Sequence, residues 1–281
     1  MNSIRFENMR PQTVLITGAA GGLGKAFALE CASRGWNLVL TDRSESLINT
    51  LAESLERGYG IRVQTFACDL TDPVKREDLF RQVVSTGTRL TMLVNVAGID
   101  HEGTFMAQTS QQIQEILRIN VEAPLAMIHT AVQYRDRRSA FRIINVASLA
   151  AFYPMPSKAT YASSKRFLLN FSMALNQEFK EMNATVTALC PAGLPTTPEC
   201  IKAIDAQGLA GALTTVDTGR AAYLTLEASL QGKPVVIPGF FNRLIHLAGS
   251  LVPANLLAAI IGKRWGEVRQ KRVSRGELAA V

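Results

Sequence analysis

"TGAAGGLG", residues 17–24, follows a predicted strand and opens a predicted helix, Leu23–Arg34. Its glycines, Gly18, Gly22 and Gly24, allow a sharp turn and let the backbone approach a ligand closely. The start of the helix then offers unpaired N–H groups and a partial positive charge, which suit a pyrophosphate. A flexible glycine turn without a ligand is the alternative. The position of the stretch at the first strand-to-helix crossover favours nucleotide binding.

Apolar segments rich in β-forming residues alternate with helical segments outward from this stretch. Continuously apolar segments are typical of strands that are buried on both faces. The predicted strands are Thr13–Thr17, Asn37–Thr41, Arg62–Ala67, Met92–Asn95, Arg142–Ala147, Thr185–Leu189 and Pro234–Ile237. The predicted helices are Leu23–Arg34, Glu45–Arg57, Pro73–Ser85, Ser110–Tyr134, Tyr161–Glu181 and Asp217–Leu230. This alternation predicts an α/β fold, a Rossmann-type doubly wound parallel sheet of about seven strands.

The composition argues against several classes of protein. Hydrophobic residues make up 47% of the 281 residues and charged residues 19%, which is ordinary for a globular protein with a well-buried core. The net charge is +7, but residues 262–276 hold six basic residues against one acid, so the excess is mostly a tail. No zinc-finger or basic-zipper signature accompanies it, and we expect no nucleic-acid partner. The four cysteines, Cys31, Cys68, Cys190 and Cys200, lack metal-binding spacings, so we expect no metal site, free thiols and a cytoplasmic location.

The end of the second predicted strand bears on the choice of nucleotide. Asp42 lies 18 residues beyond Gly24, where a dinucleotide fold places the carboxylate that binds the ribose hydroxyls of adenosine. A helix cap is the alternative, since Asp caps well. Arg43 is suited to a 2′-phosphate, but Asp42 would repel one. We therefore expect NAD to be preferred, with NADP as the alternative.

Short motifs in a fixed order make the chain resemble the short-chain dehydrogenase/reductase family, from about residue 11 to residue 238. The glycine stretch fits the family's pattern, and two residues, Val96 and Ala192, depart from the motifs that follow. Those motifs are CDL at 68–70, NVAG at 95–98, RIN at 118–120, NVAS at 145–148, YASSK at 161–165 and CPAG at 190–193. The resemblance implies a nicotinamide-dependent oxidoreductase that interconverts a secondary alcohol and a ketone.

The resemblance also implies roles for individual residues. Tyr161 would be the general acid/base, and Ser148 would hydrogen-bond the substrate oxygen. Lys165 would hold the nicotinamide ribose and favour tyrosinate, and Asn120 would hold a water that links Lys165 to solvent. The residues implied for cofactor binding are Gly18, Gly22, Leu23, Gly24, Asp42, Arg43, Asp69, Leu70, Asn95, Ala97, Gly98, Tyr161, Lys165, Pro191, Gly193 and Thr196.

Tyr161 and Lys165 lie four residues apart, so a helix places them on one face, one turn apart. Taken alone, such a pair is more often two unrelated residues on an exposed helix. A free tyrosine has a pKa near 10, which is too high for a base at neutral pH. A cation about 5 Å away lowers that pKa by roughly two units, and the oxidised nicotinamide acts in the same direction. With the surrounding motifs, we interpret the two residues as a catalytic pair.

The last part of the chain follows a different pattern. We divide the chain into a catalytic domain that binds NAD or NADP, residues 1–238, and a helical extension with a basic tail, residues 239–281. Apolar residues fall at helical spacings over Phe240–Val252, Pro253 breaks the run, and Leu256–Ile261 repeat the pattern. Such a helix pair can cap the substrate cleft or a partner subunit. It can instead make a peripheral contact with an anionic membrane.

The substrate and the partners are less constrained. Apolar residues over Phe152–Pro156 and in a predicted mobile lid, Leu194–Leu213, favour a hydrophobic alcohol or ketone, such as an acyl-chain, sterol-like or polyketide-like compound. The resemblance implies a homodimer or homotetramer that pairs through residues 110–134 and 158–181. The alternative function is a non-catalytic dinucleotide-binding regulatory or membrane-surface protein on the same fold. The intact set of four catalytic residues favours the enzyme.

Overall fold

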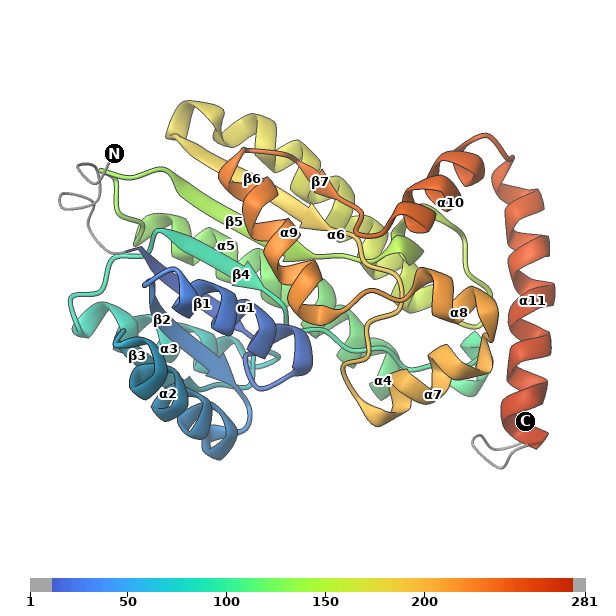
Figure 1. Ribbon diagram of the computed structural model, residues 1–281, viewed down its shortest axis with the longest axis horizontal. Helices are drawn as coiled ribbons and strands as arrows, with labels where there is room; N and C mark the ends of the chain where they lie inside the picture. The colour runs from blue at the N-terminus through green and yellow to red at the C-terminus, as the bar shows by residue number, and fades with distance from the viewer. Residues whose placement is uncertain (1–11, 275–281) are drawn as a thin grey trace.

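The computed structural model describes residues 12–274, which form one seven-stranded sheet with helices on both faces (Figure 1). The strands are β1 (Thr13–Thr17), β2 (Asn37–Asp42), β3 (Val63–Ala67), β4 (Met92–Asn95), β5 (Phe141–Val146), β6 (Ala184–Leu189) and β7 (Val235–Val236). Their order is β3-β2-β1-β4-β5-β6-β7, and every pairing is parallel. The doubly wound parallel sheet is confirmed. Its strand order reverses between β1 and β4, where such sheets form a crevice.

The helices largely match the predicted ranges. They are α1 (Gly22–Ser33), α2 (Glu45–Tyr59), α3 (Pro73–Ser85), α4 (Ser110–Leu117), α5 (Ala123–Gln133), α6 (Ala159–Glu178), α7 (Pro198–Ala206), α8 (Leu209–Thr214), α9 (Thr218–Leu230), α10 (Phe240–Ser250) and α11 (Ala254–Ser274). Local chemistry fixes several starts. Before α3, the Asp72 side chain accepts hydrogen bonds from the N–H groups of Val74 and Lys75, and Pro73 occupies the first helical position, where no N–H is needed.

Alternate residues of each strand bury their side chains on opposite faces of the sheet. On β1, Val14 and Ile16 pack with the apolar residues of α1, α2 and α9. Leu15, between them, packs with the apolar residues of α3, α5 and α6. All three are fully buried. This two-sided burial explains why the strands read as continuously apolar segments.

The long helix predicted over residues 110–134 is interrupted, and this prediction was wrong. A π-helical turn, η2 (Arg118–Glu122), separates α4 from α5. Pro124 lies in the first turn of α5 and has no N–H to donate to the carbonyl four residues earlier, which belongs to Asn120. The Asn120 side chain bonds instead to the backbone of Ile99 and to Ser164. The turn therefore has a local cause at a residue that the sequence singled out for function.

The helices α7, α8, α10 and α11 gather beyond the carboxyl ends of the strands (Figure 1). The predicted lid, residues 194–213, contains α7 and most of α8, and its mobility stays a prediction. Asn242 is buried and ties α10 down, because its side-chain amide donates to the carbonyls of Thr214 and Pro238. None of the helices within residues 12–274 combines the length and the apolar composition that crossing a bilayer requires. The division into a catalytic domain and an extension stays a prediction.

Candidate functional site

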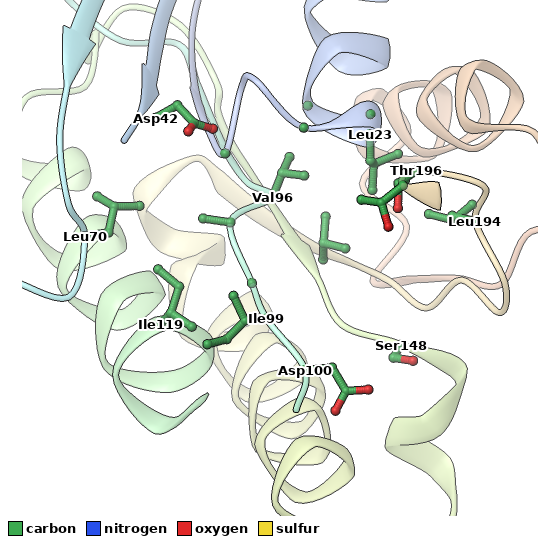
Figure 2. A pocket seen from close by; sticks show the side chains of 18 of the residues that line it. Leu23, Asp42, Leu70, Val96, Ile99, Asp100, Ile119, Ser148, Leu194 and Thr196 are labelled. Atoms are coloured by element: carbon green, nitrogen blue, oxygen red, sulfur yellow. The ribbon is translucent and has the colours of Figure 1, made fainter. Parts of the chain in front are cut away.

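A cleft of about 460 Å³ opens at the carboxyl ends of the strands. Figure 2 shows it running from Asp42, at the end of β2, past Val96 to Ser148 and Asp100. Most of the residues that the sequence assigned to a site line this one cleft. They are Gly18, Gly22, Leu23, Gly24, Asp42, Arg43, Asp69, Leu70, Ala97, Gly98, Ser148, Tyr161, Lys165, Pro191 and Thr196.

The glycine end of the cleft is built from backbone in close contact. Gly18 has a φ of +63°, and a Cβ there would lie 2.8 Å from the amide nitrogen of Ala97. A Cβ on Gly24 would lie 2.1 Å from the carbonyl oxygen of Gly18. The Thr17 hydroxyl accepts hydrogen bonds from the N–H groups of Val96 and Ala97, at 3.1 and 3.2 Å. The turn after β4 is thereby clamped against the glycine stretch, and Val96 takes part through its backbone.

The start of α1 faces this cleft without a side-chain cap. The residue before the helix is Gly21, which has no side chain to accept from the first amides. Gly22 and Leu23, the first helical residues, line the cleft. Free N–H groups at a helix start, beside glycines that leave room for a close approach, fit the pyrophosphate of a dinucleotide. The residues present therefore fit the cofactor that the sequence implies.

Two carboxylates border the same end. The Asp42 carboxylate accepts from the N–H groups of Ala20 and Ser44, at 3.0 and 3.3 Å, which leaves lone pairs on both oxygens for a ligand. Burial acts to raise the pKa of Asp69, but hydrogen bonds from the N–H and hydroxyl of Thr71, together with the charges of Arg43 and Lys75, lower it overall. Asp69 is therefore ionised at neutral pH and acts as an acceptor.

Tyr161 and Lys165 lie on the first two turns of α6 and both line the cleft. The ammonium of Lys165 lies 5.8 Å from the centre of the Tyr161 ring and donates to the Val146 carbonyl at 2.9 Å. A Cβ on Gly98 would lie 3.0 Å from this ammonium, so glycine is needed for the lysine to reach its place. Ser148 follows β5 and lines the same cleft, with its hydroxyl oxygen accepting from the N–H of Ala150.

The electrostatics of this pair differ from the expectation. Burial and the Asp100 carboxylate raise the pKa of Tyr161, against the lowering effects of a hydrogen bond from Ser148 and of the Lys158 charge. Burial lowers the pKa of Lys165 to about 8. The predicted lowering of the tyrosine pKa is therefore not a property of the protein by itself. The reason is desolvation, which disfavours tyrosinate as well as a charged lysine.

Three of the predicted residues, Asn95, Gly193 and Asn120, are not among those that line the cleft within residues 12–274. Asn95 donates to the Asn145 side chain at 2.9 Å and supports β4 against β5. A Cβ on Gly193 would lie 3.0 Å from the Ile204 side chain, which belongs to α7 of the predicted lid. Both Nδ2 hydrogens of Asn120 are used, on the Ile99 carbonyl and the Ser164 hydroxyl.

Other residues at the cleft escaped the sequence analysis. Asp100 lines it beside Ser148, as Figure 2 shows, and its carboxylate pairs with Lys158. The Lys158 ammonium also lies 5.3 Å from the centre of the Trp265 ring, on α11. The position of Lys158 three residues before Tyr161 was a usable signal, because such spacing places side chains together at a helix start. Nothing local in the sequence connects Asp100 with Trp265.

The match to a family settles the wider relationship. A family model described as short chain dehydrogenase matches residues 12–202, which is more than half of the chain. The chain belongs to this family. The resemblance inferred from the motifs is thereby confirmed, and the fold agrees with that of solved relatives.

The curated relatives of this chain carry the names of different activities. The chain is 31% identical over 192 residues to a very-long-chain 3-oxoacyl-CoA reductase from Laccaria bicolor, covering 67% of this chain and 56% of that protein. It is 31% identical over 189 residues to 17-beta-hydroxysteroid dehydrogenase type 3 from Mus musculus, covering 66% of this chain and 61% of that protein. The chain therefore spans less than two thirds of the length of these curated relatives.

One solved structure extends the comparison to most of the chain. A short-chain dehydrogenase from Sphingobium yanoikuyae, in complex with NADPH, is 28% identical, with a TM-score of 0.72. The match covers 85% of this chain and 93% of that one. The shared region therefore extends beyond residues 12–202, which the family model matches.

Proposed function

We propose that the protein is an NAD(P)-dependent oxidoreductase that interconverts a secondary alcohol and a ketone. The observation that carries the proposal is the meeting of Tyr161, Lys165 and Ser148 in the cleft that also holds the glycine stretch. When bound, the dinucleotide would supply a nicotinamide able to exchange a hydride with the substrate carbon. Gly18, Gly24 and the start of α1 would hold its pyrophosphate.

The chain's own side chains manage the substrate oxygen and its proton. Ser148 hydrogen-bonds the oxygen, and Tyr161 exchanges a proton with it through its hydroxyl. Lys165 faces the tyrosine ring at 5.8 Å and supplies positive charge to the site. Burial of these groups strengthens each electrostatic effect, because few water molecules screen them. The roles carry over from the family motif at the matching residues and are supported by this geometry.

The interruption of the helix at η2 gives the Asn120 carbonyl a role in binding a water. Pro124 leaves the Asn120 carbonyl without its α-helical donor, so that oxygen is free to accept a hydrogen bond from a water. Gly98 adjoins both the Asn120 side chain and the Lys165 ammonium, at 3.1 and 3.0 Å from where its Cβ would be. We place the water that links Lys165 to solvent at this carbonyl, and not at the side-chain amide, whose donors are used.

The preferred cofactor is NAD. Asp42 keeps free lone pairs beside the cleft, and its charge would repel a 2′-phosphate. Arg43 lines the same cleft and opposes this preference. Fluorescence titration should give tighter binding of NADH than of NADPH, and Asp42→Ala should weaken NADH binding more than NADPH binding. Tighter binding of NADPH by the unmodified protein would show that Arg43 dominates.

The substrate is a hydrophobic alcohol or ketone, of an acyl-chain, sterol-like or polyketide-like kind. Ile99, Ile119 and Leu194 line the cleft and offer apolar surface (Figure 2). The names of the reductase and dehydrogenase relatives, which refer to an acyl-CoA and to hydroxysteroids, support the same class. The test is a screen at the nicotinamide absorbance band with both cofactors and a graded series of ketones and alcohols. Turnover of short polar ketones alone would contradict the substrate class, and no turnover of any would favour the non-catalytic alternative.

We propose a homodimer or homotetramer that pairs through α4, α5 and α6. The helices α4 and α6 carry apolar side chains at the surface, and Phe167, Met173 and Leu117 are each exposed by more than 40%. A second copy of the chain would cover them. Light scattering should give a mass of two or four chains, and Phe167→Glu should lower it. A monomer at all concentrations would contradict the proposal.

We also propose that α10 makes a peripheral contact with an anionic membrane. Phe240, Leu244, Leu247 and Leu251 lie at helical spacings, and their exposure ranges from 45% to 80%. No acidic residue occurs between residues 228 and 266, whereas Arg243, Lys263 and Arg264 do. An exposed apolar stripe with only positive charge around it suits an anionic bilayer.

Sedimentation with vesicles tests this contact. The protein should sediment with vesicles that contain phosphatidylserine and remain in solution with pure phosphatidylcholine. Leu247→Glu should abolish the binding, because the exposed side chain would carry a negative charge to the bilayer. Equal behaviour of both proteins with both vesicles would contradict the contact. The cytoplasmic location stays a prediction.

A further inference from the structure

Two lysines, and not one, face the ring of Tyr161. The Lys165 ammonium lies 5.8 Å from the ring centre, and the Lys158 ammonium lies at the same distance. Lys165 belongs to the family motif, whereas Lys158 is the residue that precedes α6. A cation at a helix start meets the positive end of the helix dipole. Other groups must therefore stabilise the Lys158 ammonium at the start of α6.

Three side chains from two other segments hold the Lys158 ammonium. It donates a hydrogen bond to the Asp100 carboxylate, and a Glu102 carboxylate oxygen lies 3.9 Å away. The Trp265 ring of α11 lies 5.3 Å from it, at cation–π distance. The Lys158 side chain is only 17% exposed. Burial alone would lower the pKa of Lys158, but the two carboxylates raise it above its usual value.

Asp100 brings negative charge to the same place. One carboxylate oxygen binds Lys158, whereas the other, Oδ1, is buried and accepts no hydrogen bond within residues 12–274. Asp100 also acts on Lys165, whose pKa it raises against the effect of burial. An unpaired buried acceptor is costly, so the pair with Lys158 is what makes this charge tolerable.

The groups around Tyr161 come from several segments. Asp100 and Glu102 follow β4, Ser148 follows β5, and Cys200 lies on α7. Lys158 and Lys165 belong to the start of α6. On the Tyr161 hydroxyl, Asp100 raises the pKa and Lys158 lowers it. The ion pair therefore presents two opposed charges to one proton.

We propose that Lys158 and Asp100 are positioning residues that hold Tyr161 and balance the charge around it, and that Trp265 of α11 shields this ion pair from solvent. The inference rests on the proposed role of Tyr161 in proton transfer. It makes the C-terminal helix a part of the catalytic site. Loss of Lys158 leaves the Asp100 carboxylate without its cation beside Tyr161, and loss of Asp100 leaves Lys158 with only the more distant Glu102 carboxylate. Loss of both restores the original net charge around Tyr161.

Three variants test the balance: Lys158→Met, Asp100→Asn and the double variant. The pH dependence of kcat/KM should move to higher pH in Lys158→Met and to lower pH in Asp100→Asn, each by about one pH unit. The double variant should return to within a few tenths of the unmodified protein, as a coupled pair requires. Shifts of one sign in both single variants, or additive shifts in the double variant, would overturn the proposal.

A spectroscopic titration separates Tyr161 from Lys165, the other buried group of the pair that ionises. Tyrosinate absorbance is recorded for each variant and for the same variant with Tyr161→Phe, and the difference reports Tyr161 alone. This measurement needs no turnover. It should show the same opposed shifts even where the reaction proves to be a different one, and identical curves for all variants would overturn the ion pair's role.

The salt dependence of the Tyr161 titration tests whether Trp265 shields the ion pair from solvent. In the unmodified protein the Tyr161 titration should change little between about 0.1 M and 1 M salt, because buried charges are poorly screened. In Trp265→Ala the two charges meet solvent, and their separate effects should become dependent on salt. Trp265→Phe keeps a ring and should behave as the unmodified protein. An equal salt response in all three proteins would show that Trp265 shields nothing.

Discussion

The two ends of the cleft are built in different ways. At the glycine end, backbone meets backbone, as where Gly18 lies against Ala97 and Gly24 against the Gly18 carbonyl. At the other end, side chains from distant segments meet, as where Asp100 pairs with Lys158 beneath Trp265. The first end excludes side chains, whereas the second depends on which side chains are present. A backbone site can recur unchanged in many proteins, and a side-chain site makes one protein differ from its relatives.

Tyr161→Phe should have the largest effect, and it changes only the end of the cleft that is built from side chains. Turnover should fall at least about 100-fold, since general acid–base catalysis contributes that much or more. Nucleotide affinity should change little, because no backbone contact of the glycine end is altered. Tyr153→Phe makes the same chemical change eight residues earlier, where the hydroxyl bonds to the Ile245 carbonyl, and serves as the control. Retention of most of the turnover in Tyr161→Phe would remove this residue from the mechanism.

Gly18→Ala breaks the backbone end. Its Cβ would overlap the Ala97 backbone, and the residue would also be held at a positive φ. Gly35→Ala is the matched control, because Gly35 has a φ of +72° and nothing within 4 Å of its Cβ position. Both variants should lose about 1–2 kcal/mol of unfolding free energy from the backbone strain. Only Gly18→Ala should also weaken nucleotide binding, by tenfold or more, in a fluorescence titration. Equal binding by the two would show that the close approach is unimportant.

Lys165→Met tests a residue that belongs to both ends of the cleft, because its ammonium adjoins Gly98 and also faces the Tyr161 ring. The pKa of Lys165 is about 8 in the folded protein and 10.5 in the unfolded one, so its buried charge lowers stability by about 3 kcal/mol at neutral pH. The hydrogen bond to Val146 offsets about 1 kcal/mol. Urea unfolding should therefore show that Lys165→Met is more stable by about 2 kcal/mol at pH 7.

The stability gained in Lys165→Met should decrease as the pH rises. A base with a lowered folded pKa destabilises the fold fully below that pKa. The gain should thus be complete below about pH 8, shrink between pH 8 and 10.5, and vanish above. A gain that grew with pH, or a variant less stable at pH 7, would show that the Lys165 charge is well solvated. The same variant should lose turnover, which would make this lysine a stability cost kept for function.

Gly249→Ala should have the smallest effect. It tests the contact between α10 and Tyr153, which lies in the segment between Ser148 and Tyr161. Its Cβ would lie 2.5 Å from the Tyr153 ring, which can move aside at a cost of about 1 kcal/mol. Turnover should fall several-fold with nucleotide affinity unchanged. Gly266→Ala is the control, because nothing lies within 4 Å of that Cβ position. Equal turnover of the two variants would mean that α10 does not support the site.

The same contrast explains what could be predicted from the sequence. The glycine stretch, the strands and the pair Tyr161 and Lys165 follow local rules of spacing and periodicity, and the structure places them as expected. The interruption at residues 118–122 was missed because helical periodicity alone continues through it, although Pro124 was a signal. The ion pair of Asp100 and Lys158 joins residues 58 positions apart, and no local pattern specifies such a contact.

The π-helical turn at Arg118–Glu122 allows the site to change while the fold is kept. A bond from residue i to i+5 takes up one residue more than the α-helical bond, so such a turn absorbs a single extra residue locally. Deleting one residue there, with Pro124 also replaced by a residue that carries an N–H, would join α4 and α5 into a regular helix with the faces of both still turned to the core. The site around Asn120 would be lost while the packing of Met127 and Ile128 survived. A change confined to this turn can therefore remove the site around Asn120 from this architecture without unfolding it.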